Sequence, residues 1–397
     1  MSRIYAVFYA HVFSGRDWER FGCRTFAEKG YKVIAAEFFD LIHPGERQSD
    51  TYRHLSPFAK SVRIGDGAAV DRLVNELDDD AIVLNLLPIG PRTRPVFNAL
   101  AQRRINYGVA SLGKIPQDCR AYWRYSLGLR DYVKQMASEQ RRSWGERLRN
   151  LGRRKARSGS GAGAGWWLDA GTFKDPFQPT PTEQSGAKRL SVHSFDAETA
   201  DNANADAFDG DYAVFLDDGF LGHPDFSFLG IPQTWSEEEY AGALKRLFDH
   251  VEREMGLEVK IALHPKSNEQ AFADNLPGRK LYRKRTADLV KGARLAITQC
   301  STSISFAVLF NKPVLFVTTD ELESHDLFGP LAARLSSWLG YRRFNIDRSD
   351  RLNRLTLPTP DPAAYAAYTR AFLKAPDAAD GSIWETLERE MMESAPV

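Results

Sequence analysis

Three short polar clusters in the second half of the chain combine residue types that could carry out acid–base and phosphate chemistry. Asp217–Gly219 follows the apolar run YAVFL, His264–Lys266 follows VKIAL, and Ser301–Ser303 follows AITQC. The carboxyl ends of parallel strands meet at one edge of a sheet, where open α/β proteins bind their ligands. We therefore expect the three clusters to lie together, and this shared position is more informative than any one motif.

The first cluster is a pair of aspartates followed by a glycine. Like charges side by side raise the pKa of one carboxyl towards a useful range, so Asp217 and Asp218 could supply a general base. The structural alternatives are a helix cap or an Asx turn with Gly219 at positive φ, because Asp-Asp-Gly is a common turn.

The second cluster places a histidine at the end of a strand. His264 could donate to a leaving phosphate, and Lys266 could act on the same group as a point charge. Pro265 restricts the backbone of His264 to extended or polyproline geometry. His-Pro is weak as a pattern, because it also occurs at His43-Pro44 and His223-Pro224. The alternative is a loop histidine with a local hydrogen bond.

The third cluster is predicted to open a helix. A helix start offers unpaired N–H groups and the positive end of the helix dipole, so it binds anions. The hydroxyls of Ser301, Thr302 and Ser303 would add donors to a bound phosphate. Alternatively, Ser301 simply caps the helix, since Ser and Thr are favoured at that position.

Clustered aspartates can also hold a metal ion, and Asp-x-Asp spacing occurs at Asp209–Asp211 and within Asp78–Asp80. Both runs precede a predicted strand, so they would lie at the edge of the sheet opposite the three polar clusters. A polar turn is the better interpretation of each run. We therefore predict no metal and no cofactor. No GxxxxGK(S/T) or GxGxxG motif follows a strand, which disfavours nucleotide kinases and dehydrogenases.

The elements that must position these clusters form two α/β sets. In the first, apolar strands at 4–9, 31–39, 80–88 and 105–111 alternate with helices at 17–30, 67–77 and 94–104. In the second, strands at 212–216, 258–265, 279–284, 294–299 and 313–319 alternate with helices at 237–256, 286–293 and 301–311. A strand at 189–195 and helices at 362–375 and 382–393 are also predicted. Continuously apolar strands separated by helices indicate parallel sheets covered on both faces.

This pattern predicts two tandem Rossmann-like, doubly wound domains with the ligand site in the cleft between them. The first spans 1–200, the second spans 201–375, and a C-terminal helix within 376–397 could cross back. The first includes a basic helical segment at 132–157 and a flexible SGSGAGAG linker at 158–165.

Composition restricts the function classes. The chain has 397 residues, 43% of them apolar and 26% charged, which indicates a globular protein large enough for two cores. A net charge of +1 argues against a nucleic-acid binder. Three widely spaced cysteines without a CxxC pair fit a reducing compartment. With no apolar run near ~18 residues and an N-terminus that reads as a strand, we expect a cytoplasmic protein.

Taken together, the order Asp-Asp-Gly, His-Pro and Ser/Thr resembles the motifs of bacterial sialyltransferases and related Kdo transferases, over residues 212–320. That resemblance implies a metal-independent, inverting glycosyltransferase of the GT-B fold, which uses a CMP-activated acidic sugar to extend a bacterial surface glycan of capsule or lipopolysaccharide. It implies Asp218 as general base, His264 as the contact to the CMP phosphate, and Ser301 and Thr302, with Ser303 as substitute, as holding that phosphate. Ser14 and Gly15, after the first strand, are candidate acceptor-side residues.

Two alternatives remain. Residues 286–322 are similar to the C-terminal region of CDP-glycerol and CDP-ribitol phosphotransferases, although Gln299-Cys300-Ser301-Thr302 stands where those proteins typically have Asp-Tyr-Ser-Ser. Two Rossmann lobes could also make a non-catalytic nucleotide-sugar-binding subunit.

In the basic segment at 132–157, Glu139 and Glu146 stand against Arg141, Arg142, Arg147, Arg149, Arg153, Arg154, Lys155 and Arg157. Anionic lipids attract such segments by about 1 kcal/mol per basic residue, so a peripheral position on the inner face of a bacterial plasma membrane is expected. The alternative is a solvated helix face whose arginines pair with nearby acids.

Overall fold

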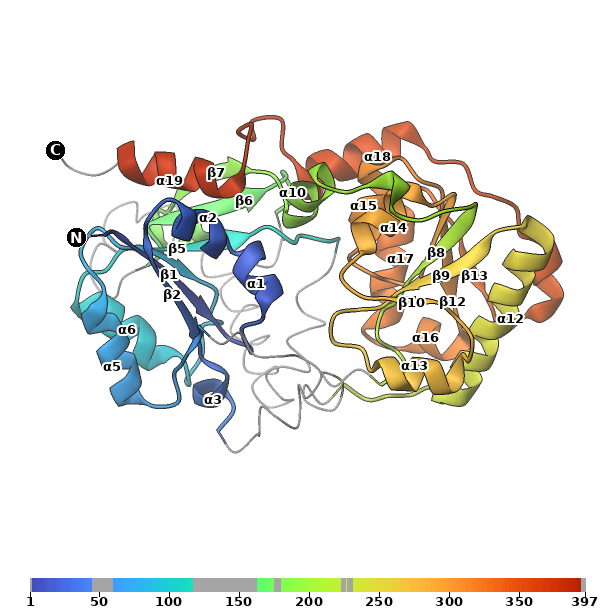
Figure 1. Ribbon diagram of the computed structural model, residues 1–397, viewed down its shortest axis with the longest axis horizontal. Helices are drawn as coiled ribbons and strands as arrows, with labels where there is room; N and C mark the ends of the chain where they lie inside the picture. Colours follow the sequence, from blue (N-terminus) through green and yellow to red (C-terminus); the bar gives the residue numbers. More distant parts are fainter. Residues whose placement is uncertain are drawn as a thin grey trace, which may run out of the picture.

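The computed structural model describes residues 2–44, 60–116, 163–174, 180–222, 226 and 231–393, without the side chains of 349–351. It has two lobes side by side, each built round one sheet in which every neighbouring pair of strands is parallel (Figure 1). The predicted architecture of two tandem, doubly wound α/β domains is therefore confirmed. The basic segment 132–157 and most of the 158–165 linker lie outside the described residues.

The N-terminal domain has a seven-stranded sheet in the order β3-β2-β1-β4-β5-β6-β7. The strands are β1 (Ile4–Tyr9), β2 (Lys32–Glu37), β3 (Val62–Arg63), β4 (Ile82–Asn85), β5 (Tyr107–Ser111), β6 (Trp166–Ala170) and β7 (Lys188–Val192). The helices of this half are α1 (Gly15–Arg20), α2 (Cys23–Glu28), α3 (Phe39–Ile42), α5 (Gly67–Glu76), α6 (Arg94–Gln102), α9 (Pro181–Ser185) and α10 (Phe195–Asp201).

The C-terminal domain has a six-stranded sheet in the order β10-β9-β8-β11-β12-β13. The strands are β8 (Tyr212–Leu216), β9 (Glu258–Ala262), β10 (Leu281–Tyr282), β11 (Leu295–Thr298), β12 (Val314–Thr318) and β13 (Arg343–Asn345). The helices of this half of the chain are α12 (Glu237–Met255), α13 (Glu269–Asn275), α14 (Thr286–Gly292), α15 (Ile304–Leu309), α16 (Asp320–Ser324), α17 (Phe328–Trp338), α18 (Pro362–Tyr368), a π-helix (Thr369–Leu373) and α19 (Ile383–Glu393), the last of which lies on the N-terminal domain. The strand order reverses beside β8, so the crevice of this sheet opens between β8 and β11.

Both faces of the N-terminal sheet are covered at its centre, which is why β1 is apolar along its whole length. Ala6 and Phe8 of β1 belong to a buried cluster with α5 and α6, whereas Tyr5 and Val7 belong to a second cluster with α2. Successive side chains of a strand point to opposite faces, so one short strand contributes to two cores.

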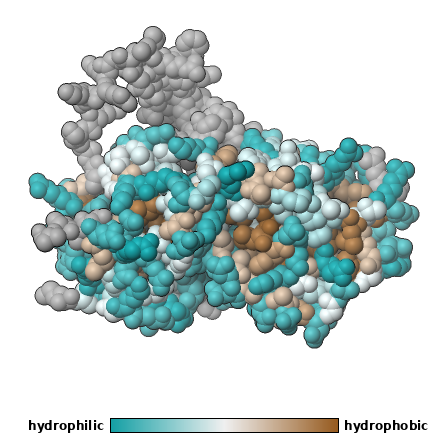
Figure 2. All heavy atoms as spheres, turned by 90° about the horizontal axis from the view of Figure 1, so that it is seen from above, coloured by the Kyte–Doolittle hydropathy of each residue, from teal (hydrophilic) through white to brown (hydrophobic). Residues whose placement is uncertain are grey.

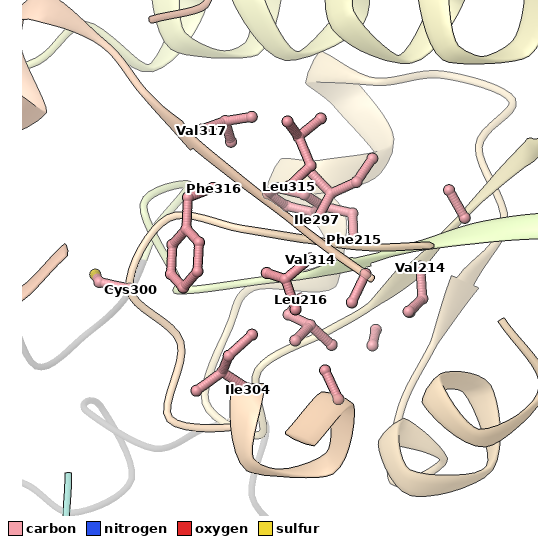
Figure 3. Packing of buried hydrophobic residues seen from close by; sticks show 14 of the residues in the cluster. Val214, Phe215, Leu216, Ile297, Cys300, Ile304, Val314, Leu315, Phe316 and Val317 are labelled. Atoms are coloured by element: carbon pink, nitrogen blue, oxygen red, sulfur yellow. The ribbon is translucent and has the colours of Figure 1, made fainter. Parts of the chain in front are cut away.

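The C-terminal sheet packs in the same way. Figure 3 shows Phe215 of β8, Ile297 of β11 and Leu315 of β12 close together, with Ile304 of α15 on the sheet. Because α15 packs through Ile304 and its neighbours, the turn before this helix is fixed against the carboxyl end of β11.

The end of the chain returns to the N-terminal domain. α19 lies along the N-terminal lobe, away from α18 on the other lobe (Figure 1). Trp384 and Leu387 of α19 are buried in the cluster on the α2 face of the sheet. Lys188 of β7 pairs with Glu390 at 2.8 Å. The last helix therefore completes the first domain.

The single helix predicted over 17–30 is two helices, α1 and α2. The break falls at Gly22, which has a φ of +70°. Trp384 packs against this glycine so closely that an added Cβ would lie 2.3 Å from the indole ring. Gly22 follows the C-cap Phe21 in the left-handed conformation, which is a common helix stop, so this glycine was the local signal for the break.

Strand β6 was not predicted. The burial of Trp166 and Trp167, which are 2% and 3% exposed, places both residues in the core. Asp169, in the same strand, is also buried and pairs with Arg189 at 2.7 Å and with Lys114. An ion pair between distant residues allows a charged side chain inside a strand.

Figure 2 shows mostly hydrophilic side chains over the N-terminal lobe and patches of apolar surface on the C-terminal lobe. Among the helices that the structure describes, none is long and apolar enough to cross a bilayer.

Candidate active site

A cavity of about 850 Å³ lies between the two domains. The N-terminal domain lines it with residues that follow its strands, among them Gly15, Arg16, Glu19, Arg20, Leu112–Lys114 and Ser194–Asp196. The C-terminal domain lines it with His264–Pro265 and Ser301–Ser303, after β9 and β11. The carboxyl edges of both sheets therefore meet at one space, and the three polar clusters come together at the edge of the C-terminal sheet.

Asp217 connects the ends of β8 and β9 through hydrogen bonds. It is 3% exposed, and its Oδ1 accepts from the amide of Gly219 at 2.7 Å. Its Oδ2 accepts from the amide of His264 at 2.9 Å and from the Ser267 hydroxyl at 2.6 Å. Burial raises the pKa of Asp217, and these three donors oppose the rise. Since Gly219 has a φ of +80°, the Asx-turn interpretation describes the geometry of this aspartate.

Replacing Asp217 with alanine should lower the free energy of unfolding by about 3 kcal/mol, because three buried donors lose their acceptor. Ser267→Ala removes one of the three and should cost about 1 kcal/mol. Urea unfolding followed by circular dichroism measures both. Equal losses in the two variants would contradict this role of Asp217.

Asp218 occupies a different environment from its neighbour. It is half-buried, and its Oδ2 accepts from the amides of Gln299 at 3.3 Å and Cys300 at 3.2 Å, at the end of β11. Burial raises the pKa of Asp218 to about 8, and the charge of Asp217 adds to the rise. Asp218 is not among the residues that line the cavity, and it lies directly behind the Ser301 turn that does.

Two residues near Asp218 were missed by sequence reasoning. Gln299 Nε2 donates to the hydroxyl of Tyr240, which is buried on α12. Burial raises the pKa of this tyrosine, and the charges of Asp218 and Asp217 raise it further. Tyr240 lies in a helix predicted from periodicity alone, which gives no signal that its hydroxyl reaches the strand edge.

His264 has a defined tautomer. Its Nδ1 accepts from the amide of Lys266 at 3.2 Å, so the proton of the neutral imidazole is on Nε2. The local hydrogen bond of the structural alternative therefore exists, and Nε2 carries the ring proton. Lys266 is half-buried beside it, and Pro265 lines the cavity.

Arg283, also missed, fixes the loop that carries His264. Its guanidinium donates to the carbonyls of Pro265 and Ser267, both at 3.0 Å, and to that of His264 at 3.3 Å. It follows directly after β10, the neighbour of β9. The predicted strand over 279–284 contained Arg283, so the sequence offered no signal that this residue lies beyond the strand end.

The serine-rich turn differs from the prediction. Helix α15 begins at Ile304, not at Ser301, and its N-cap Ser303 makes no capping hydrogen bond through its side chain. The first amides of the helix bond back to the carbonyls of Ser301, Thr302 and Ser303 at 3.1–3.3 Å. Ser301 is buried, and its amide donates a hydrogen bond to Thr298 Oγ1. Thr302 is exposed. This turn therefore presents hydroxyl groups to the cavity instead of a row of free helical amides.

On the N-terminal side, Ser14 and Gly15 have separate positions. Ser14 caps α1 through a reciprocal pair of bonds with Asp17, and it is not among the lining residues. Gly15 does line the cavity, with open space where a side chain would be. No group of three His, Cys, Asp or Glu side chains with metal-binding geometry occurs within the described ranges.

No protein-family model and no curated protein matches the sequence. Among solved structures, the chain is similar to a UDP complex of MnaA from S. aureus, with 13% identity, a TM-score of 0.48, and 96% of this chain and 93% of that one covered. It is similar to MurG from Acinetobacter baumannii, with 11% identity, a TM-score of 0.41, and 93% and 94% covered. UGT2 from Phytolacca americana gives 10% identity, a TM-score of 0.47, and 99% of both chains.

The strand orders and the shared cavity define the class of architecture on their own. Two doubly wound domains whose carboxyl edges face one cleft make a GT-B arrangement. The residues at the ends of β8, β9 and β11 determine which reaction this site could support.

Proposed function

We propose that the protein is a glycosyltransferase that moves a sugar from a nucleotide donor to a hydroxyl acceptor in the interdomain cavity. The observation that carries the proposal is the meeting of three groups at one sheet edge. These are a carboxylate with a raised pKa at Asp218, an Nε2–H donor at His264 and the hydroxyl-rich turn at Ser301–Ser303.

In the proposed reaction, the Asp218 side chain turns from the Gln299 and Cys300 amides towards the cavity. There it takes the proton of the acceptor hydroxyl while that oxygen attacks the anomeric carbon of the donor. A carboxylate whose pKa is near 8 is a stronger base than an ordinary aspartate, although a smaller share of it is ionised at neutral pH. Asp217 contributes by fixing the turn and by the effect of its charge on the pKa of Asp218. Gly219 supplies the left-handed backbone of this turn.

The bond from the anomeric carbon to the phosphate oxygen breaks in the same step, and negative charge develops on the leaving phosphate. His264 Nε2–H, the ammonium of Lys266 and the hydroxyls of Ser301, Thr302 and Ser303 would stabilise that charge. Pro265 and Arg283 keep the histidine loop in place. Closure of the two domains would exclude water.

The finer proposal follows the order of the motifs in the sequence. The donor is a CMP-activated acidic sugar such as sialic acid, another nonulosonic acid or Kdo. The acceptor is a bacterial surface glycan, and inversion at the anomeric carbon proceeds without a metal. The basic segment 132–157 would contact an anionic inner-membrane surface, which pelleting with anionic and neutral liposomes tests.

A thermal-shift panel of CMP, CDP, UDP and GDP tests the donor. CMP at 100 times its Kd should stabilise the folded protein by about 2.7 kcal/mol, and the other nucleotides by less. Selective stabilisation by CDP would favour a polyol-phosphate transferase, and by UDP a different sugar donor. No shift with any nucleotide would contradict the proposed transferase and favour a scaffold role.

A further inference from the structure

Two arginines of the N-terminal domain lie on the wall of the cavity and have no part in the site derived above. Arg16 and Arg20 are four residues apart on α1, so their side chains share one face of that helix. Both line the cavity on the wall contributed by the N-terminal domain. Ser301–Ser303 belong to the wall contributed by the other domain.

Arg20 has no anionic partner in ion-pair contact within the described part of the chain, and neither has Arg16. The Nε atom of Arg20 is buried without a hydrogen-bond acceptor. Its guanidinium carbon lies 4.2 Å from the centroid of the Phe195 ring, in a cation–π contact. Burial lowers the pKa of Arg20, and the charge of Arg16 lowers it further. A buried guanidinium beside a second one is costly unless an anion joins them.

The acidic side chains near α1 leave this charge incompletely balanced. Glu19, which also lines the cavity, forms its ion pair with Arg24 on the outer side. Asp196 and the more weakly acting Asp17 interact electrostatically with Arg20, and Asp196 also accepts a hydrogen bond from Ser305 of the other domain. Burial raises the pKa of Asp196. Two guanidinium groups therefore lie on this wall, and within the described residues neither forms an ion pair with Asp17 or Asp196.

We propose that Arg16 and Arg20 form a subsite for the carboxylate of an acidic sugar. A guanidinium group matches a carboxylate with two parallel hydrogen bonds, and two such groups would supply the partner that Arg20 lacks. A volume of about 850 Å³ has room for a sugar between this wall and the phosphate wall. The inference rests on the proposed sugar transfer, in which the carboxylate has two possible sources, the acceptor glycan and the transferred sugar.

Isothermal titration calorimetry with sialyllactose, and with lactose as its neutral counterpart, measures the subsite. Arg16→Gln and Arg20→Gln should each weaken sialyllactose binding by about tenfold or more, with lactose binding unchanged. Arg20→Lys keeps the charge but lacks the planar guanidinium that forms two parallel hydrogen bonds, so its loss of sialyllactose affinity should be smaller. Arg72→Gln, which removes an exposed arginine of α5 outside the cavity, is the matched control and should bind as the wild type does.

Steady-state kinetics separate the two sources. A raised KM for a sialylated acceptor assigns the carboxylate to the acceptor, and a raised KM for CMP-sialic acid with an unchanged Kd for CMP assigns it to the transferred sugar. CMP has no carboxylate, so failure of the wild type to bind CMP would contradict the proposed function while sialyllactose titration still tests the subsite. If folded Arg16→Gln and Arg20→Gln proteins keep wild-type sialyllactose affinity and both wild-type KM values, the subsite is overturned.

Discussion

Replacing Asp218 with asparagine is expected to reduce the rate of sugar transfer by about 10²–10⁴-fold, the usual contribution of a positioned general base. The amide keeps the size of the side chain and cannot take the acceptor proton. CMP binding should persist, because the phosphate contacts lie on His264 and Ser301–Ser303. The rate is measured with a CMP-sugar donor, with and without EDTA, which should leave the wild-type rate unchanged.

The pH dependence gives a second readout of the same residue. A base with a pKa of about 8 must lose its proton to act, so kcat/KM should rise with pH and level off above about 8. Asp218→Asn should lose this rise. Asp211→Asn, at the opposite end of β8, is the control and should keep both the rate and the profile. Wild-type activity in Asp218→Asn would end the assignment.

Protein stability should follow the opposite trend. The ordinary pKa of aspartate is 3.8, and that of Asp218 is about 8, so between these values the folded state holds a proton that the unfolded state releases. The contribution of this group to the free energy of unfolding is complete below pH 4 and is lost as pH rises through about 8. Urea unfolding over this range should show a shallower decline in Asp218→Asn.

A large loss of stability outside the site is expected at Gly22. In Gly22→Ala the new Cβ meets the Trp384 ring at 2.3 Å, and the backbone is held at a φ of +70°. Overpacking and left-handed strain together should lower the free energy of unfolding by about 2–4 kcal/mol. Denaturant unfolding measures the change.

Gly30 provides the matched control for Gly22. It has a φ of +83°, and an added Cβ would meet nothing within 4 Å. Gly30→Ala should therefore cost about 1 kcal/mol, from backbone strain alone. Equal losses at the two glycines would show that contact with Trp384 is not the cause. Trp384→Ala in the Gly22→Ala background should recover the part of the loss that arises from the clash, relative to Trp384→Ala alone.

Much of the architecture could be predicted, because the apolar runs at β1, β4, β8 and β11 carry their own evidence of burial on both faces. The positions of Asp218, His264 and Ser301 at one edge followed from that topology. The different environments of Asp217 and Asp218 could not be predicted, because most of the hydrogen-bond donors that distinguish these adjacent aspartates come from loops distant in the sequence.

The missed features share a physical cause. Arg283, Tyr240 and the arginine pair on α1 are placed by tertiary contacts that local sequence does not encode. For the same reason α15 begins at Ile304 and not at the predicted Ser301, because burial of Ile304 against the sheet sets the first helical turn.

The packing of α19 on the first domain also bears on how the chain folds during synthesis. Trp384 and Leu387 are part of the core beneath β1 and α2, so the N-terminal domain cannot close that core until these residues have left the ribosome. The second domain is already complete in sequence by then. We expect the first domain to wait with one sheet face open, and the second to reach its native structure first.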